Sequence, residues 1–169
     1  QPIPLTYYNP ADTNTKVKVT DIKMDVYKIK SSVDNEKNRP VIVYIHTGNF
    51  LPPGINGSPT GNKTDSSAVE ICRSLARRGY VAISVDYRLG WNPIATTVQE
   101  RRGTLLNAVY RSIHDVKKAV IMIKDSASVF GINPNQIVLC GEGTGGYIAN
   151  SYTTLNKYAE MELTPFIKP

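Results

Sequence analysis

The sequence predicts an α/β fold in which a mostly parallel sheet is covered by helices on both faces. The first observation is three short, continuous apolar runs at residues 41–45, 80–85 and 136–140. Such runs are typical of strands buried on both faces. The second is that segments with apolar residues three and four apart separate them, as in amphipathic helices. Buried strands that alternate with helices favour a parallel sheet.

The first 39 residues differ from the rest and precede this core. Residues 1 to about 15 are polar and contain three prolines, which predicts an extended lead-in. Residues 17–30 alternate between apolar and polar side chains, the pattern of one or two half-buried antiparallel strands. We therefore expect a lead-in and an antiparallel hairpin over 1–39, and a parallel β/α core over 40–169.

Each core element is bounded by recognisable turn or cap residues. Residues 47–64 form a glycine-, proline- and asparagine-rich loop, after which Asp65 or Ser66 is placed to cap a helix. That helix ends at the basic residues before Gly79. A second loop is predicted over 90–103, a long amphipathic helix over 105–130, and a last helix over 147 to about 158.

Unusual residues follow all three buried strands. His46, Asp86 and Gly141 come directly after the predicted strands. Because the carboxyl ends of parallel strands meet at one edge of the sheet, ligands bind there in folds of this class. We expect the functional site at this edge.

A glycine-rich turn, Gly141-Glu142-Gly143-Thr144-Gly145-Gly146, links the last strand to the last helix. A sharp strand-to-helix turn is the context of a nucleophile elbow, G-x-S-x-G, whose central residue adopts positive φ. Gly143 accepts that conformation but supplies no attacking oxygen. The same turn also matches G-x-G-x-x-G, so a phosphate-binding loop is the alternative.

Four segments in order resemble carboxylesterases and hormone-sensitive-lipase-like esterases of the α/β-hydrolase superfamily. The turn resembles their Gly-Glu-Ser-Ala-Gly-Gly, with Gly143 and Thr144 as departures. His46-Thr47-Gly48-Asn49-Phe50 is similar to their His-Gly-Gly-Gly-Phe segment. Asp86-Tyr87-Arg88-Leu89 matches their Asp-Tyr-Arg-Leu, and residues 130–137 resemble Phe-Gly-Ile-Asp-Pro-x-x-Ile. The resemblance covers roughly residues 40 to 150 and implies an α/β-hydrolase fold.

The resemblance also implies roles for particular residues. Gly143 occupies the nucleophile position, and Gly48, Asn49 and Thr144 correspond to the oxyanion segment and its second donor. The residues expected to support the motifs are His46, Glu142, Gly141, Gly145, Gly146, Asp86 and Arg88. In this superfamily the acid and the histidine follow the nucleophile, whereas His46 and His114, the two histidines, precede position 143. We therefore expect residues 1–169 to be the N-terminal part of one hydrolase domain, with a sheet that is incomplete at its C-terminal side.

Two interpretations of function stay open. The chain is either an esterase-family member made inactive by Gly143, or a pseudoenzyme that serves as a binding or structural subunit. If a pocket is retained, its expected ligand is a small acyl ester or a small apolar molecule. If the chain is a binding or structural subunit, its expected partner is a protein that covers the exposed sheet edge. The changes at Thr47 and Asn49 accompany the loss at Gly143 and favour the pseudoenzyme.

Composition excludes several other classes. The net charge of +6 comes from scattered basic pairs rather than a patch with interleaved aromatics, so no nucleic-acid partner is expected. No apolar run approaches the roughly 20 residues of a membrane span. Two separated histidines and two separated cysteines make no zinc site, and no cofactor is expected. Cys72 and Cys140 are both expected to be buried. A start at Gln1 fits a processed secreted or periplasmic protein.

Overall fold

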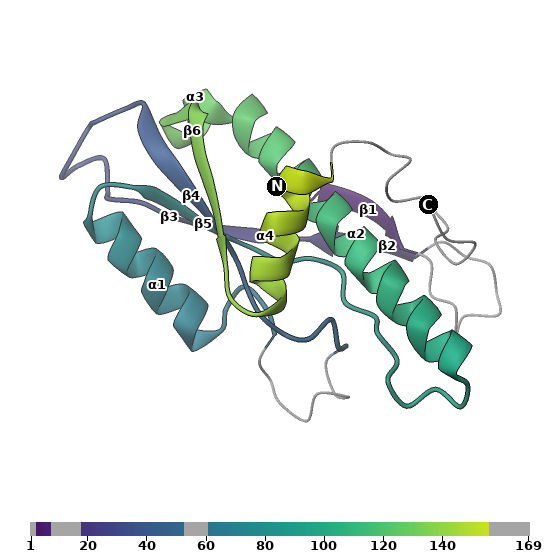
Figure 1. The fold of residues 1–169 in the computed structure, drawn as a ribbon. Coiled ribbons are helices and arrows are strands. Elements are labelled where there is room, and N and C mark those ends of the chain that lie inside the picture. Colours follow the sequence, from purple (N-terminus) through teal and green to yellow (C-terminus); the bar gives the residue numbers. More distant parts are fainter. Residues whose placement is uncertain (1–2, 8–17, 53–60, 156–169) are drawn as a thin grey trace.

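The computed structural model describes residues 3–7, 18–52 and 61–155, and Figure 1 shows their fold. The strands are β1 (Ile3–Tyr7), β2 (Lys18–Ile22), β3 (Met24–Tyr27), β4 (Arg39–Ile45), β5 (Val81–Val85) and β6 (Ile132–Gly141). The helices are α1 (Ser66–Arg77), α2 (Val98–Asp125), α3 (Ala127–Phe130) and α4 (Thr144–Thr154).

The main sheet has four strands in the order β3-β5-β4-β6. β4 lies parallel to both β5 and β6, and β3 is antiparallel to β5. Buried valine and isoleucine side chains fill β4 and β5, as at Val43 and Ile83, which are fully buried. The predicted mostly parallel sheet is confirmed.

The two antiparallel strands expected in residues 17–30 are present, but they pair with different partners. β2 pairs with β1, a strand that lies within the expected lead-in, and together they form a separate two-stranded sheet. β3 pairs with β5 at the edge of the main sheet. Only Lys23 separates the two strands, which leaves no room for the turn that a hairpin requires.

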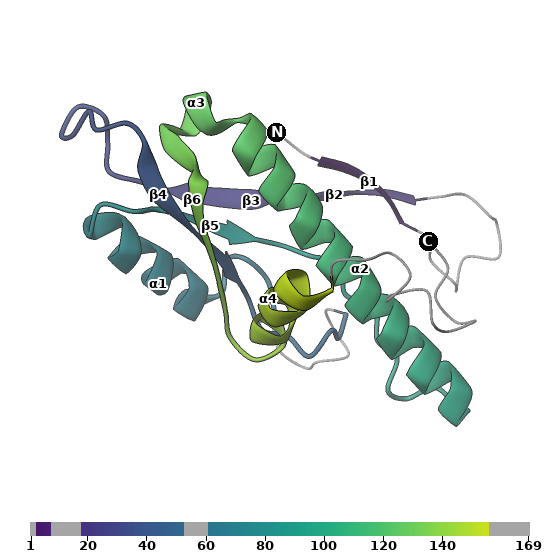
Figure 2. The same ribbon diagram turned by 45° about the horizontal axis from the view of Figure 1, so that its top comes forward.

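Helices cover both faces of the main sheet, as predicted. Figures 1 and 2 show α1 on one face and α2 with α4 on the other. A large apolar cluster lies under α2 and α4, and Val43, Ile83, Val116 and Ile148 are fully buried there. A smaller cluster under α1 contains Tyr44, Ala68, Cys72 and Ala82. The expected burial of Cys72 is confirmed.

Helix α2 begins earlier than the sequence pattern predicts. The pattern predicts a loop over 90–103, yet α2 begins at Val98 and continues through Gly103. Thr97 is the N-cap, and its side chain accepts a hydrogen bond from the backbone N–H of Glu100 at 3.1 Å. This cap, with an acidic residue in the first turn, starts the helix ahead of its apolar stripe.

The last strand departs from the expectation of a fully buried strand. β6 has β4 as its one strand partner in the described sheet, and α1 lies over β4 and β5 instead. Val138 is therefore 58% exposed, and Cys140 is exposed rather than buried. β6 also begins at Ile132, four residues before the apolar run at 136–140 that predicts this strand. Helix α4 begins at Thr144, three residues before its expected start, and the expected part beyond residue 155 lies outside the described residues.

Candidate active site

The carboxyl ends of the three parallel strands lie side by side. Ile45 is in register with Val85 on one side and with Gly141 on the other. The residues that follow these three strand ends therefore share one edge of the sheet, as the sequence predicts. The candidate site is built on this edge from the loop after β4, the loop after β5 and the turn between β6 and α4.

The turn after β6 has the geometry of a nucleophile elbow. Gly143 at its apex has φ 54° and ψ −118°, and α4 begins at the next residue. A Cβ at Gly141 would lie 2.3 Å from the carbonyl carbon of Gly145, and one at Gly145 would lie 2.0 Å from the carbonyl oxygen of Ile45. Strand, turn and helix therefore pass so closely that both positions require glycine. At Gly146 the contact is looser, because a Cβ would lie 3.2 Å from the Gly141 oxygen.

The loop after β4 turns sharply beside the elbow. Gly48 has φ 144°, and Asn49 and Phe50 have φ 54° and 58°, although neither is glycine. Backbone in this region costs of order 1–3 kcal/mol per residue and persists only where surrounding structure holds it. Here the Leu51 N–H donates to the Gly48 carbonyl at 2.9 Å, and the buried Phe50 accepts from Gly90 and Trp91 through its own carbonyl.

Tyr87 links the two halves of the site. Its hydroxyl donates to the carbonyl oxygen of His46 at 2.9 Å and lies 3.2 Å from the hydroxyl of Thr144. A phenol carries one proton, so the Thr144 hydroxyl is the donor in the second bond. The Thr144 side chain is thus directed into the fold rather than toward the apex. Burial raises the pKa of Tyr87 to about 12, which keeps the phenol protonated. The sequence motifs assign no role of its own to Tyr87.

His46 is buried at this edge of the sheet. Its ring is 2% exposed and stacks on Tyr87, with ring centroids 4.3 Å apart. Nδ1 lies 2.5 Å from the carbonyl oxygen of Thr47, an acceptor, so the proton of the neutral ring is on Nδ1. Nε2 lies 3.7 Å from Asp86 Oδ1. Burial lowers the pKa of His46, and the Thr47 carbonyl and the Asp86 carboxylate oppose that shift. These contacts hold the His46 ring against Tyr87 and Thr47, and its role in orienting the loop stays a prediction.

The lowered pKa of His46 predicts a loss of stability in mild acid. Between the ordinary histidine pKa of 6.5 and the lower folded value, the unfolded chain binds a proton that the folded chain excludes. The free energy of unfolding therefore falls as the pH drops below about 6.5. We expect His46→Gln to reduce this pH dependence, measured by urea unfolding at pH 7 and pH 5.5. His114→Gln is the matched control, because burial also lowers the pKa of His114. This substitution should leave the contribution of His46 to the pH dependence unchanged. An unchanged slope in His46→Gln would contradict the assignment.

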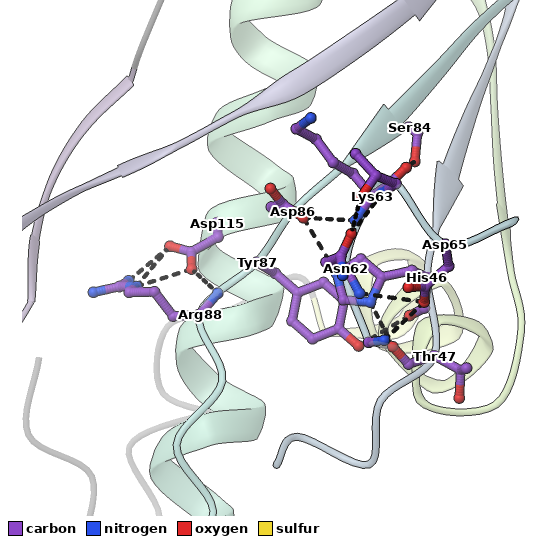
Figure 3. Close-up of polar contacts among 12 residues, drawn as sticks. His46, Thr47, Asn62, Lys63, Asp65, Ser84, Asp86, Tyr87, Arg88 and Asp115 are labelled. Carbon is purple, nitrogen blue, oxygen red and sulfur yellow. Dashed lines mark hydrogen bonds and ion pairs between the residues drawn. The ribbon is translucent and has the colours of Figure 1, made fainter. Parts of the chain in front are cut away.

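A polar strap ties the segment before α1 to the sheet edge, as Figure 3 shows. Asp86 Oδ1 accepts from the Lys63 N–H at 2.7 Å, and Ser84 donates to the Lys63 carbonyl at 2.9 Å. The Lys63 ammonium pairs with Asp25 of β3 at 2.6 Å. Asp65 is the N-cap residue of α1, one of the two predicted, but its side chain accepts from the N–H groups of Gly61 and Asn62 rather than from the helix. Burial raises the pKa of Asp86, although the Lys63 N–H opposes it.

Arg88 and Asp115 form a buried ion pair beside the site, which Figure 3 shows separated from the His46 group. The guanidinium Nη2 lies 2.7 Å from Asp115 Oδ1, Nε lies 2.8 Å from Oδ2, and the Arg88 N–H donates to Oδ2 at 2.9 Å. The Asp115 side chain is fully buried. Burial raises the pKa of Asp115, and the Arg88 hydrogen bonds oppose the shift. The pair fixes the start of the loop after β5 on α2.

Glu142 lies on the outer side of the elbow. It is exposed, and its Oε2 accepts from the Tyr44 hydroxyl at 3.2 Å. Burial, together with the Glu142 charge, raises the pKa of Tyr44 to about 12. Within residues 3–7, 18–52 and 61–155, no three His, Cys, Asp or Glu side chains are grouped so as to hold a metal ion. No helix in the same part of the chain has the length and apolar character to cross a membrane.

Comparison with known proteins identifies the family. The BD-FAE family profile matches residues 24–167. Mouse (Mus musculus) Carboxylesterase 3B is 29% identical over 82% of this chain, and Carboxylesterase 1C from Rattus norvegicus is 30% identical over 70%. Neuroligin-like protein glit-1 from Caenorhabditis elegans is 25% identical over 72% of the chain. The matched regions are 22%, 19% and 14% of those proteins, so the chain spans about a fifth of their length or less.

Solved esterases share the fold. Thermogutta terrifontis esterase 2 phosphorylated by paraoxon aligns with a TM-score of 0.58 at 24% identity, covering 80% of this chain and 44% of that one. The propionate-bound form of Est2 aligns with a TM-score of 0.57 at 22% identity, covering 89% and 44%. This likeness shows the fold alone, whereas the profile match spans most of the chain. The chain therefore belongs to the BD-FAE family of carboxylesterase-like α/β-hydrolases.

Proposed function

We propose that this chain carries the esterase fold without serine-ester chemistry, so that a small acyl ester or small apolar ligand at the elbow is bound rather than cleaved. One observation carries the proposal. Gly143 stands at the apex of the elbow with φ 54° and ψ −118°, where a nucleophile would stand, and it has no side-chain oxygen. Without that oxygen, no acyl-enzyme intermediate forms at this position.

Neighbouring groups do not replace the missing oxygen. The Thr144 hydroxyl donates its proton to Tyr87 inside the fold and is turned from the apex. Cys140 lies in β6, before the turn. His46, at the same edge of the sheet, is buried and bound to the Thr47 carbonyl through Nδ1, so it is not placed to act as a general base.

The proposed binding element is the oxyanion segment. Its backbone N–H groups would come from the loop at Gly48 and Asn49 and from Thr144 at the start of α4. The positive φ values at Gly48, Asn49 and Phe50 support this assignment, because a strained loop beside an elbow is typical of a functional segment. These donors would hold the carbonyl oxygen of an acyl group.

Paraoxon provides the test, because Thermogutta terrifontis esterase 2 is phosphorylated by it and is the positive control. We expect the intact protein to gain no phosphoryl adduct in the peptide that contains residues 141–146. We also expect hydrolysis of a short-chain aryl ester at the rate of the buffer blank. Mass spectrometry of the digested protein and absorbance of the released phenol measure the two results. An adduct in that peptide, or turnover above the blank, would refute the proposal.

A structural or binding subunit is the second candidate, favoured by the exposed edge of the described sheet. β6 presents an apolar side chain at Val138, which is 58% exposed, next to the exposed Cys140. A protein partner that covers this edge would bury both. Location outside the cytoplasm, expected from the sequence, stays a prediction.

A further inference from the structure

The loop after β4 and the elbow each depart from the esterase motifs, at Thr47 and at Gly143, and the structure brings these two positions into contact. Thr47 follows β4 directly after His46, and Gly143 is the apex of the turn after β6. A Cβ placed on Gly143 would lie 2.5 Å from the Thr47 hydroxyl oxygen and 3.4 Å from the Thr47 Cβ. The oxygen therefore occupies space that any side chain at position 143 would enter.

Thr47 has little freedom to withdraw. Its carbonyl oxygen is bound by Nδ1 of His46, and the His46 ring is stacked on Tyr87, so the backbone at position 47 is held by buried groups. Relief must come from rotation about χ1. Threonine carries a hydroxyl and a methyl group on Cβ. Only one of its three χ1 rotamers therefore directs the Cβ hydrogen, rather than a heavy atom, toward a given neighbour.

The Thr47 hydroxyl oxygen is the atom nearest to a Cβ placed on Gly143, and the Thr47 Cβ is the next. The Thr47 hydroxyl therefore fills the volume that is free because position 143 has no side chain.

We propose that Thr47 determines which residue position 143 accepts. Thr47 and Gly143 form a steric pair: the volume between them holds either the Thr47 hydroxyl or a side chain at position 143, but not both. The inference rests on the proposed function and deepens it. Serine at position 143 would place its Cβ against the Thr47 hydroxyl, so Thr47 would have to rotate about χ1 before position 143 accepts it.

A double-mutant cycle on the intact protein tests the pair, with Gly143→Ala, Thr47→Ala and the double variant. Alanine at position 143 adds the Cβ without new chemistry, and alanine at position 47 removes the hydroxyl. We expect Gly143→Ala to lower the Tm by about 4 °C or more beyond its effect in the Thr47→Ala background, corresponding to relief of a steric contact in a domain of this size. Thermal unfolding followed by circular dichroism measures the four values.

Gly131 supplies the matched control. It has φ 70°, and no atom lies within 4 Å of a Cβ added there, so Gly131→Ala reports the cost of positive φ without a clash. Its Tm change should be the same with and without the Thr47→Ala substitution. Equal Tm losses for Gly143→Ala in both backgrounds would overturn the proposal, as would failure of both Gly143→Ala proteins to fold. Folding of the double variant alone would support it.

The result is independent of the catalytic test. If the Tm changes of the two substitutions simply add, the steric pair is refuted. The proposed function is unaffected by that result, because Gly143 still lacks a side-chain oxygen. A paraoxon adduct at the elbow would refute the proposed function without changing the measured coupling between positions 47 and 143.

Discussion

Gly145→Ala is expected to destabilise the protein by about 3 kcal/mol or more, at the upper end for overpacking. The added Cβ would lie 2.0 Å from the Ile45 carbonyl oxygen and 2.7 Å from that of His46. Both obstacles are backbone atoms at the end of β4, a strand paired on both sides, so neither rotates away. Either α4 moves off the sheet or the end of β4 is distorted. Urea unfolding of the intact protein measures the loss.

Gly146→Ala is the matched control one residue along the same helix. Its Cβ would lie 3.2 Å from the Gly141 oxygen, a tight contact that a small shift relieves. Alanine also favours the helical conformation over glycine by up to about 1 kcal/mol. We therefore expect a change within about 1 kcal/mol. Similar losses in the two variants would mean that the helix tolerates a Cβ poorly in general, and the argument from close approach at Gly145 would fail.

This elbow was largely predictable from the sequence, because its constraints are local. An apolar strand, a run of small residues and a helix follow one another without a gap, and glycine at positions 141, 143 and 145 is where the structure has close approach or positive φ. The meeting of His46, Asp86 and Gly141 at one edge was predictable as well, since it follows from parallel strands alone.

Other features depend on distant partners, which a sequence pattern does not reveal. Whether β6 is buried depends on what lies beyond it in the sheet, and its apolar composition predicted burial although Val138 is exposed. In the strap, Lys63 contacts Asp25, which is 38 positions away in the sequence, and Asp86, which is 23 positions away. The contact of Thr47 with Gly143 likewise joins two loops that are far apart in the sequence. The sequence around each of these residues does not indicate its partner.

Helix α2 carried a weaker signal. Asp115 lies between Ser112 and Ala119, which are buried on the side of α2 that faces the sheet. A carboxylate at three- and four-residue spacing from buried positions requires a partner, since an unpaired buried charge is rarely tolerated. Only the structure identifies Arg88 as that partner.

Removal of this partner is the second large effect we expect. Asp115→Ala should destabilise the protein by about 3–5 kcal/mol, the usual cost of leaving a buried charge alone. The Arg88 side chain is 13% exposed, so the guanidinium would lose its carboxylate in a mostly buried place, and the Arg88 N–H would lose its acceptor as well. Chemical unfolding of the variant and of the wild type at pH 7 gives the difference.

The double variant Arg88→Met with Asp115→Leu separates an unpaired charge from a general loss of packing. Apolar replacement of both partners leaves no charge buried, so most of the stability lost in Asp115→Ala should return. Glu70→Ala is the surface control, because the Glu70–Arg77 pair at 3.2 Å is mostly exposed and such pairs contribute about 0.5 kcal/mol. If Asp115→Ala costs no more than Glu70→Ala, the Arg88–Asp115 pair does not hold the loop after β5 to α2. In that case the sheet edge at Asp86 is positioned by the Lys63 strap and by the Asp86 N–H, which donates to the Lys23 carbonyl.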